Sequence, residues 1–112
     1  MQQVNTILHT AGDGLWSNVS KAVRITGIEL GYVNADADFG ELRVYFDTET
    51  WDIDEDGLIY TDNRFLTELR SFLEAQGFNP EDIYYSEQGM QSDEYVSLDV
   101  EESFITSFNV IA

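Results

Sequence analysis

The chain has 112 residues, of which 43% are hydrophobic and 13% aromatic, so we expect one domain over residues 1–112 with a single two-layer core. Its 22 acidic residues against five Lys and Arg give a formal net charge of −17, which argues against direct binding of nucleic acid or of an anionic membrane, because both depend on cationic side chains. The absence of Cys excludes disulfides, thiolate nucleophiles and Cys-type zinc sites.

The first 18 residues are predicted to form a short helix or a flexible arm. Val4, Ile7, Leu8 and Ala11 fall on one helical stripe over residues 3–11, before a Gly-Asp-Gly break. The segment lacks the basic start and apolar run of a signal peptide, and no stretch of the chain approaches the ~20 apolar residues of a membrane span. We therefore expect a soluble cytoplasmic protein.

Three strands are predicted before the main helix. Residues 21–33 favour a strand with a bulge at Gly27 and one face formed by Ala22, Thr26, Ile28, Leu30 and Tyr32. After a turn at 34–40, Leu42, Val44 and Phe46 alternate with polar residues, which indicates a strand with one buried face. Residues 57–61, GLIYT, supply the third strand, predicted to form an antiparallel hairpin with residues 41–51.

A helix at about 62–76 has the clearest pattern in the chain. Its apolar stripe consists of Phe65, Leu66, Leu69, Phe72 and Leu73. Asp62 can cap the first turn, and Gly77 can take the left-handed conformation that ends a helix, with Phe78 packing back.

Two more strands and a second helix complete the predicted fold. The strands are residues 82–86 and 94–100, around a loop at 87–93, and Val96, Leu98 and Val100 point inward. Glu101 and Glu102 stand where a helix N-terminus favours acids, and the stripe that follows is Phe104, Ile105, Phe108 and Ile111. The order βββαββα predicts an α+β fold of two layers: a mainly antiparallel sheet of about five strands, with both helices packed on one face.

The segment WDIDEDGLIYTDN, residues 51–63, resembles the calcium loop of EF-hand proteins in its spacing. That loop uses oxygen ligands at positions 1, 3, 5, 7 and 12 and Gly at position 6. Here position 12 is Asn63 instead of the bidentate Glu, and the segment follows a predicted strand rather than a helix. Two interpretations remain: an ordinary Asp-Gly hairpin turn, or a weak calcium site formed by Asp52, Asp54, Asp56 and the carbonyl of Leu58.

The chain lacks the residues of the common catalytic schemes. His9 is the only histidine, and no P-loop, dinucleotide-binding glycine pattern or HExxH motif is present. With no Cys as well, Ser-His-Asp and Cys-His nucleophile schemes are incomplete. We therefore expect a protein that is not an enzyme and that needs no cofactor besides the calcium ion just considered.

Acidic residues accumulate in the C-terminal part, where no Lys or Arg follows Arg70. This distribution predicts a negative surface that attracts a basic partner, unless the acids form only a solvated face. Any of Tyr45, Trp51, Tyr84 or Tyr95 that is exposed would suit a hot spot beside these charges. The candidate partner-binding residues are Glu81, Asp82, Glu87, Asp93, Glu94, Asp99, Glu101 and Glu102.

In size, charge and scarcity of Lys the chain resembles the DNA-mimic inhibitors that phages and mobile elements direct at restriction, CRISPR or transcription machinery. The resemblance implies a small acidic binding protein that occupies the nucleic-acid-binding surface of a partner protein. One alternative is a calcium-binding module built on Asp52–Gly57. Another is a structural or assembly subunit of a viral particle or complex, whose open sheet edge pairs with a neighbour.

Overall fold

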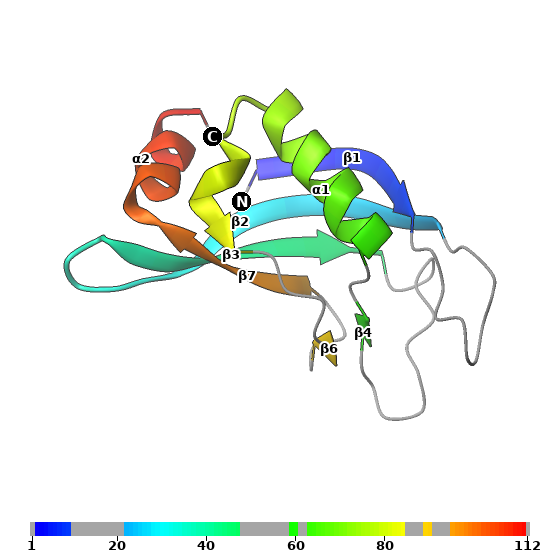
Figure 1. Ribbon diagram of the computed structural model, residues 1–112, viewed down its shortest axis with the longest axis horizontal. Helices are drawn as coiled ribbons and strands as arrows, with labels where there is room; N and C mark the ends of the chain where they lie inside the picture. The colour runs from blue at the N-terminus through cyan, green and yellow to red at the C-terminus, as the bar shows by residue number, and fades with distance from the viewer. Residues whose placement is uncertain are drawn as a thin grey trace.

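Five antiparallel strands form the main sheet of this computed structural model, with two helices on one of its faces (Figure 1). The structure describes residues 2–9, 22–47, 59–60, 63–84, 89–90 and 95–111. The strand order is β1 (Gln2–His9), β2 (Ala22–Val33), β3 (Phe39–Phe46), β7 (Tyr95–Glu101) and β5 (Ile83–Tyr84). The helices are α1 (Asn63–Ala75) and α2 (Glu102–Ile111). A short 3-10 helix, η1 (Pro80–Asp82), follows α1 and leads into β5, and α2 follows directly after β7. The predicted two-layer α+β architecture is confirmed.

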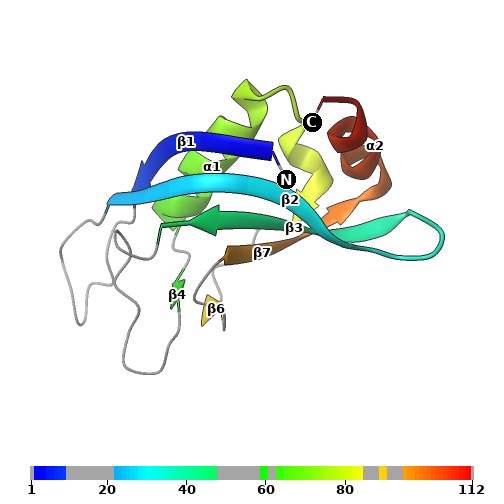
Figure 2. The same cartoon turned by 180° about the vertical axis from the view of Figure 1, so that it is seen from behind.

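The core lies between the sheet and the two helices (Figures 1 and 2). The predicted alternation is confirmed in β3, where Leu42, Val44 and Phe46 are buried and the residues between them are half-buried on the other face. β7 pairs with β3 along its whole length and contributes Val96, Leu98 and Val100. Burial of these facing rows fixes the register, because a one-residue slip would turn each row toward solvent.

The bulge predicted at Gly27 in β2 is confirmed, but the predicted face is wrong before the bulge and at Tyr32, which is 56% exposed after a second register shift. The register of β2 with β3 shifts between Ile25 and Gly27. Val23 and Ile25 are buried before the shift, while Ala22 and Thr26 are exposed. A bulge inserts one residue, so it exchanges the odd and even positions that face the core.

The predicted N-terminal helix or arm is wrong over residues 2–9, which form edge strand β1 antiparallel to β2. Val4, Thr6 and Leu8 face the core side at a period of two, whereas Ile7, a member of the predicted helical stripe, is 50% exposed. Pairing with β2 holds this segment as a strand, whereas an isolated helix of this length is only marginally stable in water. The rest of the first 18 residues lies outside the described part of the chain.

The predicted hairpin between residues 41–51 and 57–61 is wrong for its described residues, 41–47 and 59–60, while the rest of it lies outside the described part of the chain. β4 (Ile59–Tyr60) pairs with β6 (Gly89–Met90) in a separate two-stranded sheet, and β6 lies inside the predicted loop at 87–93. β3 has no free edge for a third partner, because β2 and β7 occupy both of its sides.

The main helix and its C-terminus follow the prediction. Phe65, Leu66, Leu69 and Leu73 of α1 are buried, and Gly77 has a φ of 99°. The amide of Phe78 donates to the carbonyl oxygen of Leu73 at 3.1 Å, and the amide of Gly77 donates to the carbonyl oxygen of Glu74 at 3.0 Å. These two bonds are those of a Schellman motif. The predicted cap Asp62 lies outside the described residues.

An aromatic cluster joins the end of α1 to α2. The ring of Phe78 lies 4.9 Å from that of Phe104 and 5.8 Å from that of Phe108, measured between centroids. All three side chains are buried, with Phe104 completely so. The C-terminal helix is thereby confirmed, and its apolar stripe packs as predicted at Phe104, Ile105 and Phe108.

Glu68 of α1 links the helix to edge strand β1, and its replacement is expected to act in a pH-dependent way. Its carboxylate contacts His9 Nδ1 at 2.9 Å and accepts from Arg64 Nε at 3.0 Å. Partial burial pulls the pKa of Glu68 upward, but the hydrogen bonds from His9 and Arg64 outweigh it and hold the pKa below 4.5. A lowered pKa stabilises the folded state above the unfolded-state pKa, and this contribution is lost as the pH falls through the folded-state value.

We therefore expect Glu68→Gln to lower the free energy of unfolding by about 0.5–1 kcal/mol at pH 7, and to cost less at about pH 3, which lies below the unfolded-state pKa of a glutamate. Urea unfolding at the two pH values measures the difference. Glu74→Gln, an exposed position on the same helix, serves as the control and should be neutral at both. An equal loss for Glu68→Gln at both pH values would show that its ion pairs do not stabilise the fold.

Candidate acidic binding site

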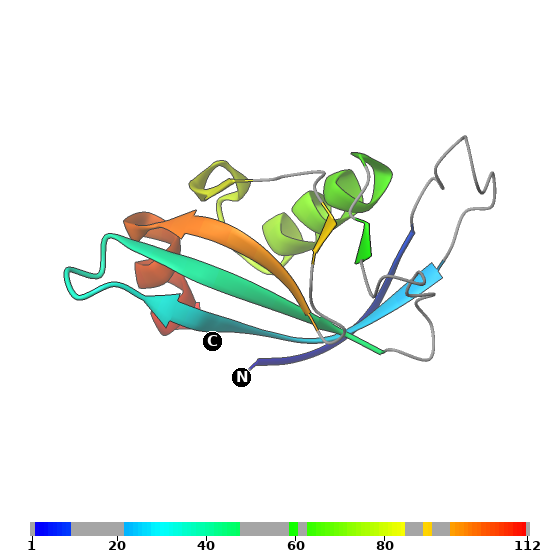
Figure 3. The ribbon, with the colours of Figure 1, turned by 90° about the horizontal axis from the view of Figure 1, so that it is seen from below.

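Figure 3 shows the sheet from the face turned away from the helices. The cross-strand pairs on this face combine polar and aromatic residues. Odd-numbered residues of β3 and β7 point to this open face, because the even-numbered ones fill the core. Along the β3–β7 ladder the pairs are Tyr45 with Tyr95, Arg43 with Ser97, Glu41 with Asp99, and Phe39 with Glu101.

One part of the open face already holds a cation from the chain itself. The guanidinium carbon of Arg43 lies 4.6 Å from the ring centroid of Tyr95, and its Nε donates to Glu41 at 2.7 Å. The other oxygen of Glu41 accepts from the hydroxyl of Ser97. The hydrogen bond to Glu41, with a smaller contribution from Tyr45, holds the pKa of Arg43 above its usual value. An aromatic ring and a carboxylate on neighbouring strands therefore form a guanidinium site in this fold.

Two of the predicted hot-spot aromatics are engaged in the same network. Tyr45 packs on Tyr95 with 5.4 Å between ring centroids, and its hydroxyl donates to Glu29 at 2.5 Å. That hydrogen bond, together with some desolvation, raises the pKa of Tyr45. Both rings are half-buried, whereas Tyr84 is 53% exposed. Trp51 lies outside the described residues.

An open pocket of about 760 Å³ lies where β7 ends and α2 begins. Tyr84 and Phe39 supply aromatic surface, with Phe39 42% exposed. The hydroxyl of Tyr84 donates to Glu101, and this hydrogen bond raises the pKa of Tyr84. Asp38, Phe39, Tyr84, Glu101, Glu102, Ser103, Thr106 and Ser107 line the pocket.

The turn between β2 and β3 holds one side of this pocket in place. The side-chain oxygen of Asn34 accepts from the amides of Asp38 at 3.0 Å and Phe39 at 3.3 Å. Ala37 takes a left-handed φ of 57° in the turn, and its amide donates to the carbonyl of Asn34. The side chain of Asn34, the first residue of the turn, thus closes the turn by hydrogen bonds, a role that Asn commonly has in turns. These bonds fix the backbone that carries Asp38 and Phe39.

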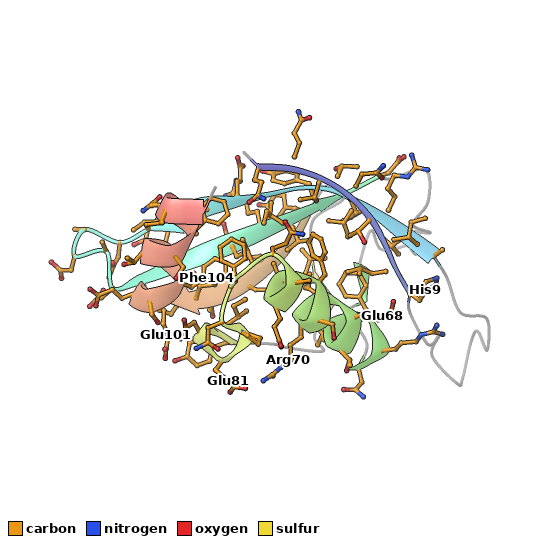
Figure 4. The ribbon with its side chains drawn as sticks, turned by 90° about the horizontal axis from the view of Figure 1, so that it is seen from above. His9, Glu68, Arg70, Glu81, Glu101 and Phe104 are labelled. Carbon is orange, nitrogen blue, oxygen red and sulfur yellow. The ribbon has the colours of Figure 1, made fainter. Side chains whose placement is uncertain are left out.

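The structure brings together three of the eight predicted partner-binding residues. Asp99, Glu101 and Glu102 lie at the junction of β7 and α2, with Asp99 paired to Tyr84 of β5. Glu81 and Asp82 lie in η1, and Glu81 forms an ion pair with Arg70 of α1 (Figure 4), so part of its charge is compensated. Glu87, Asp93 and Glu94 lie outside the described residues.

Asp38 and Phe39 are pocket residues that sequence reasoning missed. Both lie in the turn predicted at 34–40, of which Phe39 and Gly40 already belong to β3, and their place beside Glu101 comes from the pairing of β3 with β7. Ser103, Thr106 and Ser107 of α2 were missed as well. Their spacing on the polar side of the predicted C-terminal helix was the available signal.

The calcium interpretation stays a prediction, because Asp52, Asp54, Asp56 and Leu58 lie outside the described residues. Within the part of the chain that the structure describes, no group of three or more His, Asp or Glu side chains is placed to hold a metal ion. Neither α1 nor α2 combines the length and apolar character that crossing a membrane requires. Comparisons with protein-family models, with curated proteins and with solved structures found no match.

Proposed function

We propose that this protein is a non-enzymatic binding protein whose acidic end engages a basic surface of a partner protein. By analogy with DNA mimics, that surface is one that otherwise binds nucleic acid, for example on a defence or transcription protein that a phage or mobile element must inhibit. Carboxylates held on a rigid scaffold attract Lys and Arg as phosphates do. The proposal places the protein in the cytoplasm, with such a partner.

The observation that carries the proposal is that three arginines pair with glutamates elsewhere in the chain, whereas a group of acidic side chains at one end has no basic residue among its described members. Arg43, Arg64 and Arg70 each form an ion pair with a glutamate of the same chain, and none of the three lines the pocket at the junction of β7 and α2. Of the described residues at that junction and in the adjoining turn, none is basic. The acids that gather there are Asp36, Asp38, Asp99, Glu101 and Glu102.

A surface of this kind predicts fast association that weakens steeply with salt. Electrostatic steering raises the association rate at low ionic strength, and screening removes the effect as salt is added. The partner's own nucleic acid should compete for the same surface, because it offers the same charge to the same Lys and Arg residues.

The test is capture from a nuclease-treated lysate on the immobilised protein, followed by elution with a salt gradient and by competition with duplex DNA. We expect nucleic-acid-binding proteins that duplex DNA displaces. With the captured partner purified, Asp99→Lys should raise the Kd about tenfold, which corresponds to ~1.4 kcal/mol. Glu74→Lys changes the net charge equally at an exposed position of α1 and should change the Kd much less.

Two results would contradict the proposal. The first is equal weakening by Asp99→Lys and Glu74→Lys, which would assign binding to net charge rather than to the acidic end. The second is capture of only further copies of this chain, which would favour the structural or assembly subunit instead.

A further inference from the structure

The pocket at the junction of β7 and α2 repeats the chemistry of the Arg43 site without its cation. At the Arg43 site a tyrosine ring and a carboxylate hold a guanidinium on the open face of the sheet. In the pocket, Phe39 pairs with Glu101 across β3 and β7, and Tyr84 donates to the same Glu101 from β5. The described residues that line the pocket include neither Lys nor Arg.

We propose that this pocket seats an arginine side chain from the partner's basic surface, with the guanidinium against the rings of Tyr84 and Phe39 and hydrogen-bonded to the carboxylates of Glu101, Glu102 or Asp38. The inference rests on the proposed function and specifies which partner side chain enters the site. The volume of about 760 Å³ lies within the roughly 300–1,000 Å³ usual for ligand pockets. The pocket therefore has room for a side chain together with its backbone.

The chemistry of the pocket favours arginine over lysine. A guanidinium is planar, stacks on aromatic faces and offers its N–H groups in a fixed fork that matches a carboxylate. A lysine ammonium is a compact, strongly hydrated charge that gains less from an exposed ring. Serine and threonine hydroxyls of α2 add acceptors to the pocket lining, at Ser103, Thr106 and Ser107.

A second copy of this chain is a poor donor of that arginine. Arg43, Arg64 and Arg70 are in ion pairs with their own glutamates, and Arg24 also has an interaction within the chain. Two chains of formal charge −17 also repel each other. The complementary occupant is a segment of a basic protein.

Two synthetic peptides of equal charge, acetyl-hexa-arginine amide and acetyl-hexa-lysine amide, test the proposal by titration calorimetry on the intact chain. We expect the arginine peptide to bind wild type at least about fivefold more tightly than the lysine peptide. Tyr84→Leu and Phe39→Leu remove a ring and leave the net charge unchanged. Each should lower affinity for the arginine peptide to that for the lysine peptide, without changing the latter.

Tyr32→Leu is the matched control, because Tyr32 is 56% exposed and does not line the pocket. It should keep the arginine preference, as should Tyr84→Phe, which retains the ring. Melting curves establish that each variant is folded. Equal wild-type affinity for the two peptides, or an unchanged preference in Tyr84→Leu and Phe39→Leu, overturns the pocket proposal and leaves the proposed function standing. Failure of both peptides to bind wild type overturns both.

Discussion

Phe104→Ala is expected to lower the free energy of unfolding by about 3–5 kcal/mol, a large fraction of the total for a domain of this size. The ring is completely buried where α2 meets the sheet and lies 4.9 Å from Phe78 and 6.1 Å from Phe108. Its removal leaves a cavity between α2, the sheet and the segment that carries Phe78, and these cannot all move inward to fill it. Urea unfolding followed by circular dichroism at fixed salt measures the change.

The control for this substitution is Val110→Ala on the same helix. Val110 is 80% exposed, so its truncation should change stability by less than about 0.5 kcal/mol. A loss below about 1 kcal/mol for Phe104→Ala would mean that the aromatic cluster does not anchor α2.

Gly40→Ala is expected to destabilise the fold by about 1–3 kcal/mol, because the added methyl group has no room. A Cβ at this position would lie 2.5 Å from the backbone oxygen of Tyr32 and 3.3 Å from Cδ1 of Ile105. The first neighbour is backbone of the paired strand β2, so β2 and β3 must move apart where they approach the turn. Thermal and urea unfolding of the variant measure the loss.

Gly31→Ala provides the comparison within the same pair of strands. Its Cβ would meet Nε and Cδ of Arg43 and Oε1 of Glu41, so the ion pair between these side chains must shift to make room. Because side chains rather than a paired strand must move, we expect a loss of less than about 1 kcal/mol, below that of Gly40→Ala. If Gly31→Ala were as destabilising as Gly40→Ala, close approach of the backbones would not be the cause.

Local patterns predicted the elements whose burial follows a regular period. The alternation at Leu42, Val44 and Phe46 and the stripe at Phe65, Leu69 and Leu73 each have one buried face, so periodicity alone identifies them. Gly77 and Phe78 marked the helix end for an equally local reason, since the left-handed turn is closed by residues of the helix itself.

Pairing between distant segments could not be predicted in the same way. The partner of β3 is β7 rather than the segment that follows it, and β1 is a strand because β2 offers it an edge. For the candidate site the consequence is direct. Charge density in the sequence pointed to Asp99, Glu101 and Glu102, but only the β3–β7 ladder adds Phe39 and Asp38 to them.

That ladder also constrains the route by which the chain folds. β1, β2 and β3 are joined as successive antiparallel neighbours, but Glu41 and Ser97, which meet across the centre of the sheet, are 56 positions apart. Bringing such distant segments together costs chain entropy before any contact repays it. Closure of the β3–β7 pair should therefore limit the folding rate, and α2, which begins where β7 ends, should dock only after that closure.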